Sequence, residues 1–189
     1  MLSAATAHAL SEALIDTERT AEQAGWDNPP QLLGMFTEAD TPVEIAAVPV
    51  RPKTWHASNP LHPGAYIPAT AILEVLTAYF TSPLTPAWLS AWLHQDDRAP
   101  VGSAFLCENP GDSRTPGHPY SDLRAMPDAA DNAIRSLSAA DIDGRYYYVL
   151  RRRGSDMASA NTDHDSTPLI RQTTAGACLY RLRHLTRLA

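Results

Sequence analysis

The chain has 189 residues, of which 44% are hydrophobic, and its formal net charge is −6. This length fits a single domain with appendages, and this hydrophobic content supports an ordinary core and argues against global disorder. The acidic balance argues against nonspecific nucleic-acid binding, which depends on neutralising phosphates, and no apolar run approaches the roughly 18 residues that a membrane-spanning helix needs.

The N-terminus and the cysteines indicate a cytoplasmic protein. Residues 1–20 have no basic stretch ahead of an apolar run and contain three carboxylates, which is unlike a secretory signal. Cys107 and Cys178 lie far apart and have no neighbouring cysteine at metal-ligand spacing, so we expect reduced, buried thiols.

Residues 3–24 are predicted to form an amphipathic helix, because their apolar side chains recur at helical spacing. Gly25 is placed as the C-cap of this helix, where left-handed geometry costs glycine little. The two prolines at 29–30 prevent the helix from resuming. Two short strands are expected next, over 32–36 and 43–50.

Residues 51–68 contain four prolines, two histidines and Trp55, so we expect an irregular segment. An apolar helix is predicted over 69–80. A second helix is predicted to open at Thr85 as its N-cap, with Pro86 at the first helical position. These two helices form a middle pair.

The stretch 101–154 is predicted to hold three strands at the centre of the fold, over 101–107, 133–142 and 145–150. Asp143-Gly144 between the last two strands indicates a type I′ turn, which needs positive φ at both central residues. The intervening residues 108–132 are rich in proline, glycine, aspartate and serine, which is typical of a functional or disordered loop.

Together these elements predict an α+β fold. We expect an antiparallel sheet of about five strands, flanked by the N-terminal helix, the middle pair and a C-terminal helix. Residues 1–154 are expected to form one domain and 155–167 a flexible polar linker. Residues 168–189 are expected to form an amphipathic helix that packs on the same domain.

The segment Ala24-Gly25-Trp26-Asp27-Asn28-Pro29-Pro30-Gln31-Leu32 resembles an AGWDxPPxL stretch of small actinobacterial proteins, in which an N-terminal helix runs into this stretch and then into a strand. Residues 126–128 and 141–154 are similar to the closing hairpin of such proteins. The resemblance covers about a quarter of the chain and implies an α+β fold and an actinobacterial origin, but no activity. The use of fourteen arginines against the single Lys53 also fits a high-GC genome.

No catalytic residue, metal or cofactor is predicted, because the phosphate-loop, dinucleotide, zincin, hydrolase-elbow and CxxC patterns do not occur. The histidines at 56, 62, 94 and 118 with Asp96 and Asp97 could form a zinc site, but we favour solvated histidines because their spacing matches no template. Cys107 could be a nucleophile beside a loop histidine, but we favour a buried structural thiol.

Arg151-Arg152-Arg153 is the densest charge feature. Alternation along a strand places Tyr147, Arg151 and Arg153 on one face, which could bind an acidic partner or a phosphate. The alternative is a solubilised strand end that guards against edge pairing. Trp55 could cap a pocket, or it could close a loop over the core.

The leading hypothesis is a non-enzymatic cytoplasmic interaction or regulatory protein with a protein partner, of which a phage-encoded accessory protein is a variant. Its candidate binding residues are Arg151, Arg153, Tyr147 and Trp55. The alternative is a small-molecule-binding protein or enzyme with its site between 51–68 and 108–132. In that case His56, His62 and His118 would supply polar groups.

Overall fold

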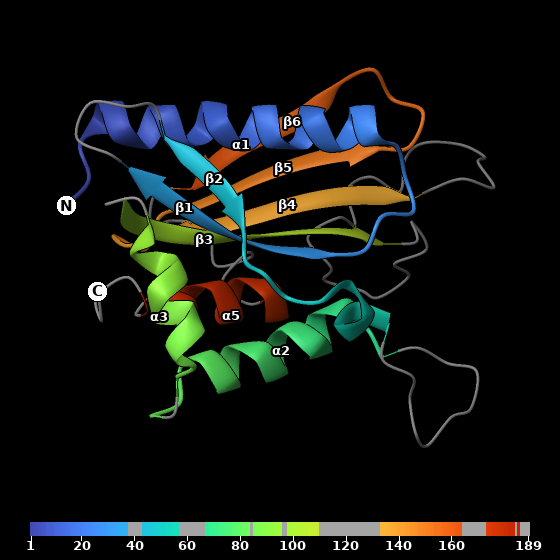
Figure 1. The fold of residues 1–189 in the computed structure, drawn as a ribbon. Coiled ribbons are helices and arrows are strands. Elements are labelled where there is room, and N and C mark those ends of the chain that lie inside the picture. The colour runs from blue at the N-terminus through green and yellow to red at the C-terminus, as the bar shows by residue number, and fades with distance from the viewer. Residues whose placement is uncertain are drawn as a thin grey trace.

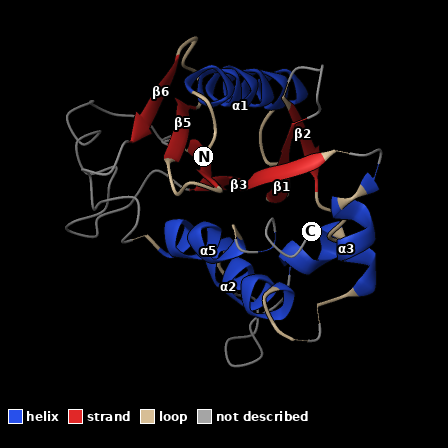
Figure 2. Cartoon of the chain, turned by 90° about the vertical axis from the view of Figure 1, so that its left-hand side faces the viewer, coloured by secondary structure: helices blue, strands red, loops and turns tan. Residues whose placement is uncertain are grey.

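The computed structural model describes residues 1–37, 43–56, 67–83, 85–95, 98–109, 133–163, 173–183 and 185. Within these residues the chain forms four α-helices and a six-stranded antiparallel sheet, which is the predicted α+β class. The long helix α1 covers one face of the sheet, and the other helices cover the opposite face (Figures 1 and 2). No helix in this part of the chain has the length and hydrophobicity needed to cross a membrane.

The sheet is antiparallel throughout, with the strand order β2-β1-β3-β4-β5-β6. Its strands are β1 Gln31–Thr37, β2 Glu44–Ala47, β3 Ala99–Asn109, β4 Ile134–Asp141, β5 Tyr146–Arg152 and β6 Ala158–Asp163. The first five lie where strands were predicted, although β2 is shorter and β3 is longer than expected. The sixth strand occupies part of the predicted linker 155–167. Its small polar residues have little strand preference, but pairing along β5 supplies the ladder, for example between Leu150 and Ser159.

The helices are α1 Ala4–Ala24, α2 Ala69–Phe80, α3 Ala87–Leu93 and α5 Thr174–Leu182, with a 3₁₀ turn, η1, at Pro52–His56. The bounds of α2 are as predicted. Helix α3 begins after Pro86, and Thr85 is not its side-chain cap. The Thr85 hydroxyl donates instead to the carbonyls of Phe80 and Ser82, which fixes the turn between α2 and α3.

The predicted type I′ turn between β4 and β5 is wrong. Of its residues only Gly144 has a positive φ, of 84°. The Gly144 N–H donates to the carbonyl of Asp141, and Asp141 pairs with Arg145, so the loop has three residues and is closed by a left-handed glycine. The buried carboxylate of Asp141 accepts the N–H groups of Asp143 and Arg145, each at 2.9 Å. A side chain at the strand end thus determines the loop length.

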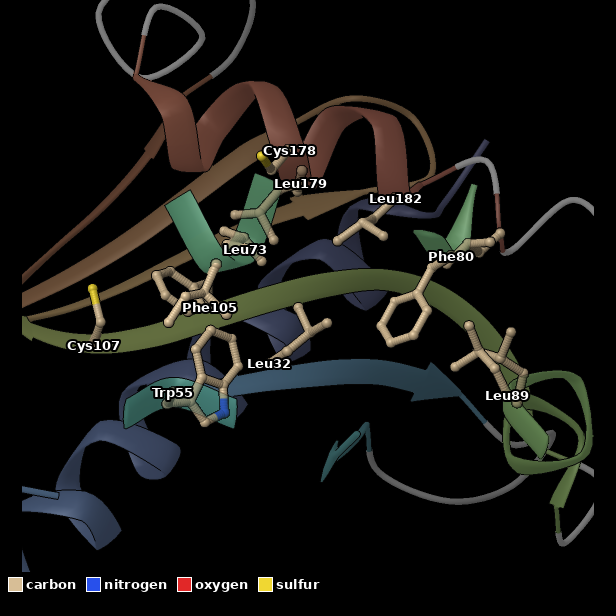
Figure 3. Close-up of a cluster of buried hydrophobic side chains, with 14 of the residues drawn as sticks. Leu32, Trp55, Leu73, Phe80, Leu89, Phe105, Cys107, Cys178, Leu179 and Leu182 are labelled. Atoms are coloured by element: carbon tan, nitrogen blue, oxygen red, sulfur yellow. The ribbon is translucent and has the colours of Figure 1, made fainter. Parts of the chain in front are cut away.

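Two apolar clusters lie on opposite faces of the sheet. The cluster under α1 contains Leu10, Leu14, Met35 and Tyr147. The larger cluster under the other helices contains the side chains labelled in Figure 3, which are Leu32, Trp55, Leu73, Phe80, Leu89, Phe105, Cys107, Cys178, Leu179 and Leu182. Helix α5 packs on α2 and on the sheet, so the C-terminal helix belongs to the same core.

Candidate functional site

Arg151 and Tyr147, two of the predicted binding residues, lie beneath α1. Arg151 is buried, and its guanidinium donates three hydrogen bonds to the carboxylate of Glu18, including one of 2.8 Å from Nη2. Tyr147 is 1% exposed, and its hydroxyl donates to Oδ2 of Asp141 at 2.9 Å. Tyr147 and Arg151 do lie on the same face of β5, as strand alternation predicted. Helix α1 covers this face, so neither side chain is open to a partner.

A buried ion cluster joins α1 to the sheet; it consists of Glu18, Glu22, Glu108, Arg135 and Arg151. Glu18 has no exposed surface, and Arg135 is 1% exposed. The Arg135 guanidinium donates to Glu22 at 2.8 Å, to Glu108 at 3.0 Å and to Glu18 at 3.5 Å. Because each buried arginine faces carboxylates from another element, the cluster fixes the position of α1 on the sheet.

The segment just after α1 covers the open end of this cluster. The Trp26 ring lies against two guanidinium groups, 4.2 Å from that of Arg135 and 5.0 Å from that of Arg153. Asp27 has a φ of 67°, donates its N–H to Glu108 at 2.6 Å and accepts from Arg153 at 2.6 Å. Arg153 is therefore engaged within the protein, beside the tryptophan and aspartate of the AGWD stretch.

The remaining predicted site residues are dispersed. Trp55 is 5% exposed and packs against Phe105 with ring centroids 5.6 Å apart, so it closes the core. His56 is exposed at the end of η1. His62 and His118 lie outside the described residues. Within the described residues no group of three or more metal-ligating side chains is assembled.

Neither cysteine is placed as a nucleophile would be. Neither cysteine forms a disulfide, and both are buried. The sulfur of Cys107 lies 3.3 Å from the Ser136 hydroxyl. Burial raises the pKa of the Cys178 thiol, which disfavours the thiolate that nucleophilic attack requires.

The buried Tyr147–Asp141 pair gives a testable pH dependence. Burial, reinforced by the nearby Asp141 carboxylate, raises the pKa of the Tyr147 hydroxyl above its ordinary value of 10.0. The fold therefore favours the neutral phenol, and this contribution is complete below about pH 10 and is lost as the pH rises above it.

Replacing Tyr147 with phenylalanine leaves the buried Asp141 carboxylate short of a donor. We expect Tyr147→Phe to lower the free energy of unfolding by about 1.5–3 kcal/mol at pH 7. The difference from wild type should narrow above pH 10, because only the wild type loses the phenol contribution there. Urea unfolding at pH 7, 9 and 11 measures it, and a constant difference across this range would contradict the assignment.

A groove lies between the segment after β2 and the helices α2 and α3; we call it the α2–α3 groove. Its volume is about 470 Å³. Its lining residues are Pro49, Val50, Arg51, Thr54, Leu76, Tyr79, Phe80 and Trp88. Sequence patterns did not single out this site. Helical spacing predicts Trp88 on the packed stripe of its helix together with Leu89 and Trp92, and this is wrong for Trp88, which is exposed while Leu89 is buried.

Local structure explains why the groove forms. Prolines on either side of Val50 and Arg51 end the β2 segment, and the Thr54 N–H donates to the Arg51 carbonyl at 2.9 Å as η1 begins. On the other wall, Phe80 and Trp88 meet edge to face with centroids 5.7 Å apart. The short turn between α2 and α3 thus holds two aromatic side chains at a fixed angle, opposite a proline-stiffened segment.

Apolar side chains around the groove are exposed. Tyr79 is 51% exposed and Trp88 is 42% exposed. Val75, one helical turn before Tyr79 on α2, is 69% exposed. All three side chains belong to α2 and α3, which lie on the face of the sheet opposite α1.

Comparison of the chain with protein-family models, with curated proteins and with solved structures finds no match in any of the three. The class of the fold is α+β with an antiparallel sheet between helical layers.

Proposed function

We propose that the chain is a non-enzymatic interaction or regulatory protein that binds a protein partner through the α2–α3 groove. The observation that carries this proposal is the exposure of Val75, Tyr79 and Trp88 beside a groove with apolar walls. Contiguous exposed apolar side chains on a soluble domain mark interaction surfaces. Tryptophan and tyrosine are also the residues that most often dominate binding energy at interfaces.

The proposed compartment is the cytoplasm. Both cysteines are buried and neither forms a disulfide, which fits a reducing environment. The net charge of −6 favours a protein partner over a nucleic acid. A host-encoded regulator and a phage-encoded accessory protein are equally compatible with this surface.

Substitution of the exposed aromatic residues tests the proposal. The tagged full-length chain retrieves partners from a lysate of its native host, and each partner is then purified and titrated. Trp88→Ser and Tyr79→Ser should each raise Kd by about 30-fold, which corresponds to about 2 kcal/mol for the loss of an aromatic hot spot.

The matched control is Met157→Ser, because Met157 is 79% exposed and lies outside the groove. It should leave Kd unchanged. Circular dichroism and thermal unfolding verify that each variant is folded. If every partner binds the groove variants with the Kd of the wild type, the α2–α3 groove is not the interaction site.

The second candidate function is small-molecule binding, which the size of the groove favours. Its volume of about 470 Å³ lies within the range of about 300–1,000 Å³ that is usual for ligand pockets. Part of the segment 51–68 lines it, whereas 110–132 lies outside the described residues. In a thermal-shift screen with metals, nucleotides and acyl compounds, a ligand that raises Tm in wild type but not in Trp88→Ser would support this function over the first.

A further inference from the structure

The walls of the α2–α3 groove define what can occupy it. Val50, Leu76 and Phe80 present apolar surface, and Tyr79 and Trp88 form its rim. The carbonyl groups at the end of α2 are already used, since those of Thr77 and Tyr79 accept bonds from Thr81 and Ser82. The groove therefore offers an apolar surface with few free backbone acceptors.

A positive charge, that of Arg51, lies beside the apolar side chains of the groove. Arg51 is the one charged residue among the described lining residues, and Lys53 is also exposed two positions later. Within the described part of the chain, no ion pair or hydrogen bond engages either side chain. Glu74 of α2 is not among the residues that line the groove, and its carboxylate adds to the effect of burial in raising the pKa of the Cys178 thiol on α5. The groove is thus locally positive on a chain whose net charge is −6.

These charges select among possible occupants. A symmetric contact between two copies of the chain would bring the Arg51 and Lys53 side chains of both copies onto one small surface, which like charges disfavour. An anionic membrane is bound by clusters of about 4–8 basic residues, whereas this surface carries two and the whole chain is acidic. An acidic segment of another protein satisfies both the apolar walls and the cation.

We infer that the α2–α3 groove binds a partner segment that inserts an apolar side chain between Val50, Tyr79 and Trp88 and presents a carboxylate to Arg51. This inference rests on the proposed function and adds the chemistry of the partner. The apolar side chain supplies most of the affinity, and the carboxylate supplies the selectivity.

Three pools of fluorescein-labelled nine-residue peptides test the inference by anisotropy with the full-length chain. The first pool has degenerate apolar residues at three central positions and glutamate at the flanking positions. The second has lysine in place of glutamate, and the third has serine in place of the apolar residues. We expect wild type to bind the first pool at least tenfold tighter than either of the others.

Charge reversal gives the sharpest readout. In Arg51→Glu the preference should invert, so that the lysine pool binds more tightly than the glutamate pool. Arg19→Glu is the matched control, because Arg19 is exposed on α1, across the sheet from the groove, and the change in net charge is the same. It should leave the preference of the wild type intact.

The outcomes separate the inference from the proposed function. If Trp88→Ser abolishes peptide binding but Arg51→Glu does not change the preference, the interaction site stands and the acidic partner is wrong. If no pool binds, the inferred partner chemistry is wrong, and the Kd values of the retrieved partners alone decide the proposed function. If Trp88→Ser changes neither peptide binding nor those Kd values, both fail. Equal effects of Arg51→Glu and Arg19→Glu on the peptide preference would mean that net charge, and not Arg51, sets the preference. Self-association in sedimentation that depends on Trp88 would make a second copy of the chain the occupant of the groove. Binding to phosphatidylserine vesicles that depends on Trp88 would make an anionic membrane the occupant.

Discussion

Glu18→Ala is expected to lower the free energy of unfolding by about 3–5 kcal/mol, which is the usual cost of removing one partner from a buried ion pair. Glu18 has no exposed surface and accepts three hydrogen bonds from Arg151 as well as one from Arg135. Without this carboxylate, two buried guanidinium groups share the remaining acceptors. Chemical denaturation followed by circular dichroism measures the loss.

The control for this substitution is Glu12→Ala, on the exposed surface of the same helix. It should change the free energy of unfolding by no more than about 0.5 kcal/mol. A triple variant with apolar residues at 18, 135 and 151 should recover part of the stability, because it removes Glu18 together with both buried arginines and leaves only the partly exposed Glu22 and Glu108 charged. A loss below about 1 kcal/mol in Glu18→Ala would mean that the ion cluster does not hold α1 on the sheet.

Gly102→Ala is expected to cost about 3 kcal/mol, at the upper end of the range for overpacking a core. A Cβ at this position would lie 2.5 Å from the carbonyl oxygen of Ala140 and 2.9 Å from the Cα of Asp141. Both atoms belong to the backbone of the neighbouring strand β4, so relief requires β3 and β4 to move apart. Met35, whose Cε would also lie too close to the added Cβ, is flexible and can yield.

Gly154→Ala is the matched glycine control. Gly154 has a φ of 77°, and a Cβ added there would meet no atom within 4 Å, so only backbone strain applies. We expect a cost of about 1–2 kcal/mol there. Equal losses in the two variants, measured by urea unfolding, would show that strand separation at Gly102 is not required.

The local elements were largely predictable because their signals are local. The helix over 69–80 has the predicted bounds, and Gly25 adopts a positive φ of 92° at the end of α1. Proline, glycine and apolar periodicity act within a few residues, so they can be recognised without knowing the fold. The prediction of a type I′ turn was wrong because the side chain of Asp141 accepts the loop N–H groups. The Asp143-Gly144 pattern contains no information about this side chain.

The candidate site was less predictable. Alternation correctly placed Tyr147 and Arg151 on one strand face, but it could not show that α1 covers that face. Glu18 was detectable, since it follows Leu10 and Leu14 at four-residue intervals on the buried stripe of α1. A carboxylate at such a position indicates a buried cationic partner.

The sequence alone determined the α+β class and the approximate positions of the helices and of the first five strands, because periodicity and chain-breaking residues encode them. Only the tertiary structure decided which charged residues are interior and where a surface is left open. Arg151 and Arg153 became structural because α1 and Trp26 lie over them, while Tyr79 and Trp88 stayed exposed because no described element packs on that side of α2 and α3. These outcomes depend on contacts between residues far apart in the chain, which no local pattern contains.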